Sequence, residues 1–310
     1  MKSQNPIIIL LLILSAVFVQ AADYADPAEQ AEIVEYFEPK VNRFKAEFDE
    51  AGNVVELRLN NLGGPKNGLM SVNDEDMKRV ARLPELRYLL LWHLKIGDEG
   101  FANLAPLKSL EEWESRDFYK YNPENVTPDY LLVLNELPQI QRIDLMHMFG
   151  MKAVNLDGLG TFPQLVQFNI DTPATGEQIA AFAERNPTIQ GLGLHRTDIT
   201  HDQLARVVKA LPNLDGLLIR YANRNAHENN WASLASLRGA SNLEELHLGE
   251  GFKSPIPWGG GLEYLVGLES LERMKFSLNK DELENEPAWQ RLQQERPDIK
   301  LQDDKFTYDP

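Results

Sequence analysis

The chain has 310 residues, of which 43% are hydrophobic and 25% charged, so it contains enough apolar material for a large buried core. It contains no cysteine, which excludes disulfides, zinc–thiolate sites and thiol nucleophiles. The formal net charge of -16 argues against nucleic acid as a partner, because binding to phosphates needs a basic surface.

Residues 1–21 have the pattern of a secretory signal peptide. Lys2 gives a positive start, an apolar run extends from Ile7 to Val19, and the small residue Ala21 follows. The run has about 13 residues, short of the roughly 20 that span a bilayer, although an uncleaved membrane anchor is the alternative. We expect cleavage after Ala21, no membrane insertion of the mature chain, and a secreted or periplasmic location.

Residues 22–53 are predicted to form an N-terminal cap. A helix is expected over about 27–37, and the alternation of residues 41–48 is typical of a strand. A turn sequence from Asp49 to Asn53 leads into the next strand. We expect a hairpin whose outer strand covers the first repeat, because an open stack of repeats has to protect its ends.

From Val54 onward, the pattern apolar-x-x-apolar-x-apolar recurs in nine segments. Ser115 is the exception among the template positions. Successive side chains of a strand alternate between its two sides, so the fourth and sixth positions share one side. One short strand cannot bury that side alone, and the repeat therefore predicts parallel stacking of the units. The segments begin at Val54, Leu86, Leu110, Ile140, Leu165, Ile189, Leu214, Leu243 and Leu271.

The repeat resembles the leucine-rich-repeat family over residues 54–301. A proline stands two residues before five of the segments, at Pro84, Pro138, Pro163, Pro187 and Pro212. The connections 96–110 and 197–214 and the closing stretch 286–301 are similar to those of exported bacterial members. The resemblance implies an α/β right-handed solenoid of nine to ten repeats, with a curved parallel sheet on the concave face and helices and turns on the convex face. Residues 302–310 would form an acidic tail.

Two details of the connections refine this expectation. The ninth repeat position lacks the asparagine ladder that the family often has, which predicts irregular curvature. Helices are expected from Thr200 to Leu211, over 176–185 and over 129–137, and Asn73 is expected to cap a further helix.

The sequence carries no recognised enzyme motif or cofactor-binding motif. The glycines 259–261 follow Pro255 and Pro257 and indicate a turn rather than a phosphate-binding loop, because no βαβ context surrounds them. We therefore expect no enzymatic activity and no cofactor, and a protein, peptide or glycan as the partner.

The resemblance places the fifth, seventh and eighth positions of each repeat on the concave face. Large aromatic and arginine side chains there make good binding anchors. Trp92 and Met146 would be unusual in water without a partner, unless the side chains of neighbouring repeats cover them. The predicted ligand-binding residues are Trp92, His93, Arg116, Asp144, Met146, His147, Asp171, His195, Arg196, Arg220, Tyr221 and His247.

Two other functions remain open from the sequence. One is a structural component of the cell envelope or surface. The other is a hydrolase or metal protein, which would use Asp144, Asp171, His147, His195 and Arg220. Histidines two repeats apart lie about 10 Å from each other, too far to share an ion. Asp171, His195 and Arg220 instead suggest a ladder of charge pairs.

Overall fold

The computed structural model describes residues 23–62, 72–117, 124–146, 151, 154–171, 174–197, 199–221, 227–249, 251–278 and 280–302. The predicted signal peptide, His147 and the tail from residue 303 lie outside these ranges, as does the side chain of Tyr221. Within the described ranges, no helix is long and apolar enough to cross a membrane.

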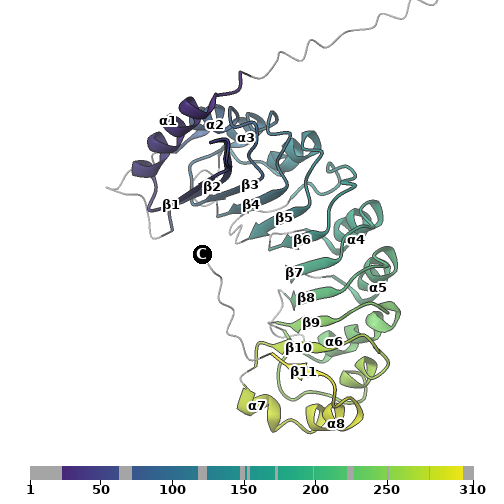
Figure 1. Cartoon of the computed structure of the whole chain (residues 1–310). Coiled ribbons are helices and arrows are strands. Elements are labelled where there is room, and N and C mark those ends of the chain that lie inside the picture. The colour runs from purple at the N-terminus through teal and green to yellow at the C-terminus, as the bar shows by residue number, and fades with distance from the viewer. Residues whose placement is uncertain are drawn as a thin grey trace, which may run out of the picture.

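One curved sheet runs through the described part of the chain, with its strands in chain order from β1 to β11. β1 is antiparallel to β2, and each later strand is parallel to the one before it. Figure 1 shows the strands along the inside of an arc, with helices such as α2 to α5 on its outer side. This arrangement confirms the α/β leucine-rich-repeat solenoid. The strands are β1 (Arg43–Phe48), β2 (Val54–Asn60), β3 (Tyr88–Trp92), β4 (Glu112–Arg116), β5 (Arg142–Met146), β6 (Gln167–Ile170), β7 (Gly191–Thr197), β8 (Gly216–Tyr221), β9 (Glu245–Leu248), β10 (Arg273–Phe276) and β11 (Lys300–Leu301).

The sixth template position forms one continuous buried column. The strand register pairs Leu59 with Leu91, and each later member with its counterpart on the next strand. Each side chain covers its neighbours, so the column removes from water the apolar surface that one strand could not hide. Its members are Leu59, Leu91, Ser115, Leu145, Ile170, Leu194, Ile219, Leu248 and Phe276.

Ser115 interrupts the column where an aromatic cluster packs behind it. The ring of Phe101 lies 5.0 Å from that of Tyr130 and 5.8 Å from that of Trp113. Burial raises the pKa of Tyr130 well above its usual value, and the nearby Ser115 hydroxyl opposes this only in part. A small polar residue at this position leaves room for the aromatic rings and gives the buried phenol a polar neighbour.

Capping boxes begin several of the convex helices. Thr175 and Gln178 cap α4 and Thr200 and Gln203 cap α5, and each pair exchanges side-chain-to-backbone hydrogen bonds. The predicted helices at 176–185 and after Thr200 are therefore present, and Asn73 caps α2 as expected. Residues 130–136 form the tighter 3₁₀-helix η3 (Tyr130–Glu136) in place of the expected α-helix. The other helices are α1 (Pro27–Phe37), α2 (Asp74–Val80), α3 (Asp98–Ala102), α4 (Gly176–Arg185), α5 (His201–Ala210), α6 (His227–Ala232), α7 (Lys280–Glu284), α8 (Pro287–Glu295), η1 (Glu38–Lys40), η4 (Ser233–Gly239) and η5 (Leu262–Leu265).

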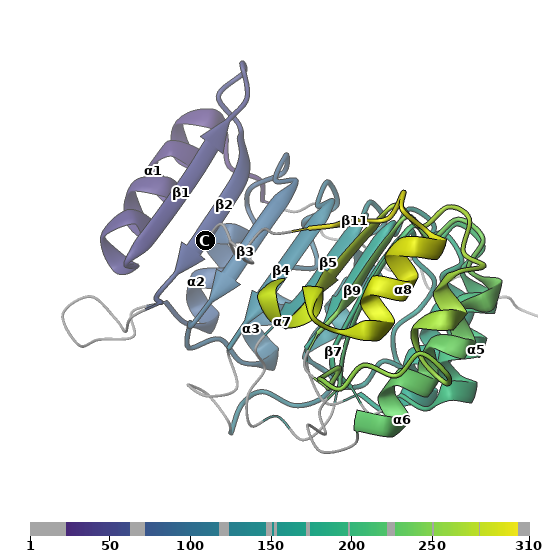
Figure 2. The ribbon, with the colours of Figure 1, turned by 90° about the horizontal axis from the view of Figure 1, so that it is seen from below.

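The hairpin and α1 close the N-terminal end of the sheet, and α8 lies at the other end (Figure 2). The fully buried Gln30 joins α1 to the hairpin. Its amide donates hydrogen bonds to the Ala25 carbonyl at 2.9 Å and to the Asn53 side chain at 3.2 Å. Its carbonyl accepts from the Val54 backbone at 2.8 Å. These partners belong to the N-terminal cap or to the start of β2. The hydrogen bonds of Gln30 therefore hold α1 over the first repeat.

Candidate binding site on the concave face

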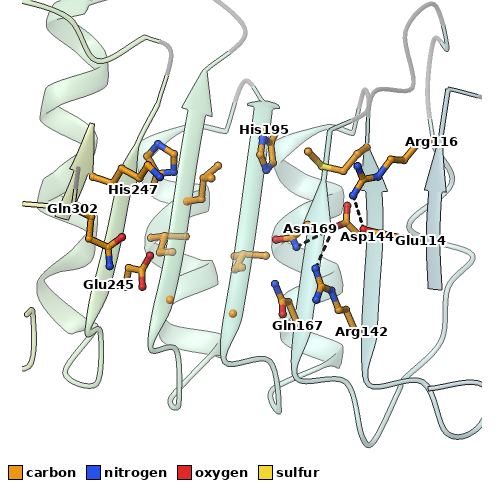
Figure 3. Close-up of a pocket in the computed structure, with 17 residues that line it drawn as sticks. Glu114, Arg116, Arg142, Asp144, Gln167, Asn169, His195, Glu245, His247 and Gln302 are labelled. Carbon is orange, nitrogen blue, oxygen red and sulfur yellow. Dashed lines mark hydrogen bonds and ion pairs between the residues drawn. The ribbon is translucent and has the colours of Figure 1, made fainter. Parts of the chain in front are cut away.

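The concave face is formed by the third, fifth and seventh template positions, which alternate with the buried fourth and sixth. A cavity of about 490 Å³ opens on it, which we call the concave hollow (Figure 3). Its lining comes from strands β4 to β10 and from the residue after β11. The lining residues are Glu114, Arg116, Arg142, Asp144, Met146, Gln167, Asn169, Gly191, Leu192, His195, Gly216, Leu217, Leu218, Glu245, His247, Lys275 and Gln302.

Glycines at the third position make the middle of the hollow. Gly191 and Gly216 are register partners on β7 and β8. A Cβ at Gly216 would come no nearer to another residue than 3.9 Å, from the Gly191 Cα. The backbone of two adjacent strands is therefore left without side chains at this position. The hollow exists because these residues are small, since the strands themselves keep the ordinary spacing of a sheet.

On β4 to β6, the hollow is bordered by charges that compensate one another, which we call the paired side: Glu114, Arg116, Arg142, Asp144 and Asn169. Arg116 donates to the Glu114 carboxylate at 2.5 Å, and the Arg142 guanidinium lies 3.6 Å from the Asp144 carboxylate. Burial, together with the charge of Glu114, raises the pKa of Asp144 to about 6. Arg116, Arg142 and the Asn169 amide oppose the shift. This side therefore carries little net charge.

On β7 to β10, four nitrogen-bearing side chains come together, which we call the basic side: His195, Arg220, His247 and Lys275. An Arg220 guanidinium nitrogen lies 3.5 Å from Nδ1 of His195. Burial, together with the charges of Lys275, His195 and Arg220, lowers the pKa of His247 to about 3. The imidazole of His247 is therefore neutral at neutral pH. Arg220 stands beside the lining, and the other three residues belong to it.

The concave face of β3 to β5 is filled by side chains. Leu90, Trp92 and Met146 are only 3%, 8% and 2% exposed. The guanidinium carbon of Arg116 lies 4.9 Å from the centre of the Trp92 ring. Trp92 is therefore covered by its neighbours, as the alternative left open from the sequence had it, whereas Met146 lines the hollow although its side chain is almost fully buried. Neighbouring strands are about 4.8 Å apart, so large side chains at the same repeat position of adjacent strands contact each other.

The eighth position turns the chain out of the strand. His93, Asp117 and Arg196 have φ angles of 55°, 56° and 50°, in the left-handed region. His93 lies 2.7 Å from the Asp117 carboxylate. Arg196 donates from two nitrogens to both carboxylate oxygens of Asp171, each at 2.5 Å. These residues therefore make polar contacts at the strand ends. The prediction that the eighth position faces water is wrong for His93 and Asp117, which are buried.

Comparisons with known proteins bear on the fold only. No family model and no curated protein sequence matches the chain. A solved structure of a TLR13–ssRNA13 complex is similar over 66% of this chain and 32% of that chain, at 18% identity and a TM-score of 0.44. A solved structure of the Rad7–Elc1 complex in yeast is similar over 81% of this chain and 62% of that chain, at 17% identity and a TM-score of 0.49. The chain thus spans less than two thirds of the length of either.

The structure divides the predicted ligand-binding residues into groups. Arg116, Asp144, Met146, His195 and His247 line the concave hollow. His147 and the side chain of Tyr221 lie outside the described residues. Of the predicted ladder, the His195–Arg220 contact is present, and Asp171 pairs with Arg196. The predicted residues that do not line the hollow are Trp92, His93, Asp171, Arg196 and Arg220.

Sequence reasoning missed the third template position. Arg142, Gln167 and Glu245 line the hollow from this position, together with the two glycines of its floor. The signal was present, because the third position lies two residues before the fifth and therefore on the same side of the strand. Gly191 and Gly216 mark the opening, since each removes a concave side chain at the third position of adjacent segments.

Among the described residues, no group of three or more His, Cys, Asp or Glu side chains is arranged to hold a metal ion. The hollow instead offers charged and polar side chains around an uncovered stretch of backbone at Gly191 and Gly216. This arrangement is suited to binding a segment of another molecule.

Proposed function

We propose that the chain is a non-enzymatic recognition module that binds a short segment of a protein or peptide in the concave hollow. The glycine floor carries this proposal, because a rigid sheet that leaves a cavity of about 490 Å³ has a preformed place for a ligand. Ligand sites in proteins generally have volumes of roughly 300–1,000 Å³. Leu192, Leu217 and Leu218 supply apolar contact, and the two charged sides supply orientation.

A peptide fits this lining better than a glycan does. The described lining contains charged, amide and aliphatic side chains, and no Phe, Tyr or Trp is among them. Sugar rings pack their apolar faces on flat aromatic rings, and the hollow offers none. Exposed backbone at Gly191 and Gly216, by contrast, lets another main chain approach closely.

Filling the hollow tests the proposal. Gly216→Val adds a side chain at an open place in the floor, and valine is favoured in strands, so the fold is expected to persist. Gly267→Val is the matched control, because a Cβ there meets nothing within 4 Å and Gly267 does not line the hollow. Peptides selected by display on the mature chain are measured against both variants by fluorescence polarisation, with circular dichroism to check folding.

We expect at least tenfold weaker binding by Gly216→Val and unchanged binding by Gly267→Val. Equal binding by the two variants would place recognition elsewhere on the molecule. If the folded chain binds neither a peptide nor an oligosaccharide, the concave face has no such ligand. That result would favour the alternative function, a structural component of the cell envelope or surface.

Export is part of the same proposal. It is supported by the sequence of residues 1–21, with its positive start and its apolar run. N-terminal sequencing of the protein purified from a secreting bacterial host is expected to begin at Ala22. A chain that starts at Met1 in the membrane fraction would contradict this.

We also propose that nucleic acid is not the partner, which is supported by the net charge of -16. A labelled single-stranded RNA is expected to show no saturable binding at 0.15 M salt. Binding that weakens with salt along a straight logarithmic plot would show that a local basic patch outweighs the overall charge.

A further inference from the structure

The first strand of the sheet, β1, has one edge that pairs with β2 and one edge that faces outward. Of the strands that the structure describes, only β2 pairs with β1, and Figure 2 shows β1 as the outermost strand at this end. Ile33 and Phe37 of α1 belong to the core behind the sheet, so the helix covers the buried side of β1 rather than its edge. An edge six residues long is therefore available to another strand.

The turn after β1 shows which backbone groups point away from β2. The N–H of Asp49 donates to the Asn53 carbonyl at 2.9 Å, so it points toward β2. Successive residues of a strand point their backbone N–H groups to alternate edges. The N–H groups of Phe44, Ala46 and Phe48 therefore point to the outer edge, where a further strand would give them hydrogen-bond partners.

The two ends of the sheet differ in how they discourage pairing with another chain. β11, at the far end, has only two residues, and a very short edge strand is a common protection against such pairing. β1 is longer, and it carries Phe48, a large apolar side chain that is 46% exposed. An added strand beside β1 would cover Phe48, so this edge has the features of an interface.

The charges of β1 match those of a second copy in one antiparallel register. Charged side chains on an edge oppose pairing where like charges face each other. Centring the pair on Lys45 or on Glu47 places that residue opposite itself, and centring it on Phe44 or Phe48 also brings like charges together. Centring it on Ala46 avoids every such conflict. The facing pairs between the two copies are then Ala46 with Ala46, Lys45 with Glu47, Phe44 with Phe48, and Arg43 with Asp49.

We propose that two copies of the chain pair antiparallel through β1, with Ala46 at the two-fold axis, and form one continuous sheet. A two-fold interface has to be complementary to itself, and the register centred on Ala46 meets this condition. Lys45 contacts Glu47 at 2.7 Å and Glu56 at 3.1 Å in its own chain, and the side chains of Lys45 and Glu47 are about half exposed, so the pairing buries no isolated charge. The axis is perpendicular to the sheet and leaves both concave faces on the same side. This inference is independent of what the concave hollow binds.

Sedimentation velocity of the mature chain at concentrations up to about 1 mM tests the pairing. The chain is expected to double its mass as the concentration rises. Ala46→Pro removes an N–H from the outer edge, where proline is tolerated, and should therefore keep the fold and prevent the dimer. Glu50→Pro, in the turn after β1, is the matched control and should form the dimer normally, with circular dichroism to check folding of both variants. A chain that stays monomeric at every concentration, or an Ala46→Pro variant that forms the dimer as tightly as the unchanged chain, would overturn the proposal.

Charge reversal tests the facing of Lys45 and Glu47. Lys45→Glu and Glu47→Lys each place like charges opposite each other, so each variant alone is expected to form the dimer at least tenfold more weakly. When the two variants are mixed, opposite charges face each other again at both places. The mixture should therefore form a dimer about as tightly as the unchanged chain does, and a mixture that associates no better than its components would overturn the register.

A single introduced cysteine tests the position of the axis, because the chain has no cysteine of its own. Ala46→Cys faces its own copy with the Cα atoms about 5.5 Å apart, so mild oxidation is expected to link the two copies. Glu50→Cys is the control, since its two copies lie roughly 26 Å apart along the strands and cannot form a disulfide. Cross-linking of Glu50→Cys to the same extent as Ala46→Cys would overturn the register centred on Ala46.

Discussion

The two halves of the concave face have the same backbone arrangement and differ in the side chains that the strands carry. In the half formed by β3 to β5, the fifth and seventh rows carry Leu90, Trp92 and Met146, whose side chains are almost fully buried, and residues of β4 and β5 only border the hollow. In the half formed by β6 to β10, the third row includes Gly191 and Gly216, and the hollow opens there. A solenoid can therefore keep one architecture along its length while side-chain volume decides where a ligand fits.

The halves also treat charge differently. In the filled half, the buried Arg116 and Glu114 neutralise each other at 2.5 Å. In the open half, the charges of Arg220 and Lys275 act together on His247. The filled half uses charge to hold its own side chains, and the open half gathers basic side chains around a neutral imidazole.

The largest expected effect is the loss of the buried ion pair. Arg116→Ala leaves Glu114 buried without this partner and should reduce the free energy of unfolding by about 3–5 kcal/mol. Lys275→Ala, the counterpart in the open half, should change it by less than about 1 kcal/mol, because its side chain is partly exposed. Urea unfolding followed by circular dichroism measures both. If both variants lowered the free energy of unfolding by similar amounts, the two halves would not differ in how they use charge.

Asp144 should make the filled half more stable in acid. Its pKa of about 6 in the folded chain lies above its ordinary value of 3.8. Between these values the folded chain holds a proton that the unfolded chain has released, so stability falls as pH rises from about 4 to 6. Asp144→Asn should remove this loss and raise the free energy of unfolding at pH 7 by about 2 kcal/mol.

Urea unfolding of Asp144→Asn at several pH values gives the test, and Asp171→Asn is its control. Asp171 is buried and bonded by Arg196 at 2.5 Å, so its replacement should destabilise the chain at pH 7. A destabilised Asp144→Asn variant at pH 7 would contradict the prediction.

His247 should have the opposite pH dependence in the open half. Its pKa of about 3 in the folded chain lies below its ordinary value of 6.5, so the unfolded chain binds the proton first as pH falls. Stability is therefore lost as pH decreases below 6.5, by about 1 kcal/mol at pH 5.5. His247→Gln should remove this part of the acid sensitivity. The ratio of the urea midpoints at pH 7 and pH 5.5 measures this acid sensitivity. If His247→Gln left the ratio unchanged, His247 would be protonated as easily in the folded chain as in the unfolded chain.

The smallest expected effect comes from the floor itself. Gly216→Ala should raise the free energy of unfolding by about 0.5–1 kcal/mol, because alanine restricts the unfolded chain and meets no obstacle here. Gly249→Ala should instead destabilise by about 1–3 kcal/mol, because its Cβ overlaps Arg220. Thermal unfolding of the two variants compares them. Equal effects would mean that the open floor and the Arg220 position are not distinct environments.

The order of the strands followed from the sequence alone. The apolar spacing that begins at Val54 placed every parallel strand from β2 to β10, because alternation fixes which side of a strand is buried. The cap helix over 27–37 and the hairpin were predictable from local capping and turn residues. These features depend on neighbours within a few residues, so the chain carries the information locally.

The candidate site depended on contacts between repeats, and much of it was not predictable. Nothing in the spacing shows that Trp92 is covered by Arg116, or that Arg196 leaves the strand with a φ of 50° and bonds Asp171. These contacts join residues about 24 or 25 positions apart, and they depend on how far side chains of different size reach across adjacent strands. The repeat sequence determined the scaffold and its concave face. Only the packing of one repeat on the next decided that Gly191 and Gly216 meet to form a hollow, because a cavity is set by the side chains around it rather than by any one segment.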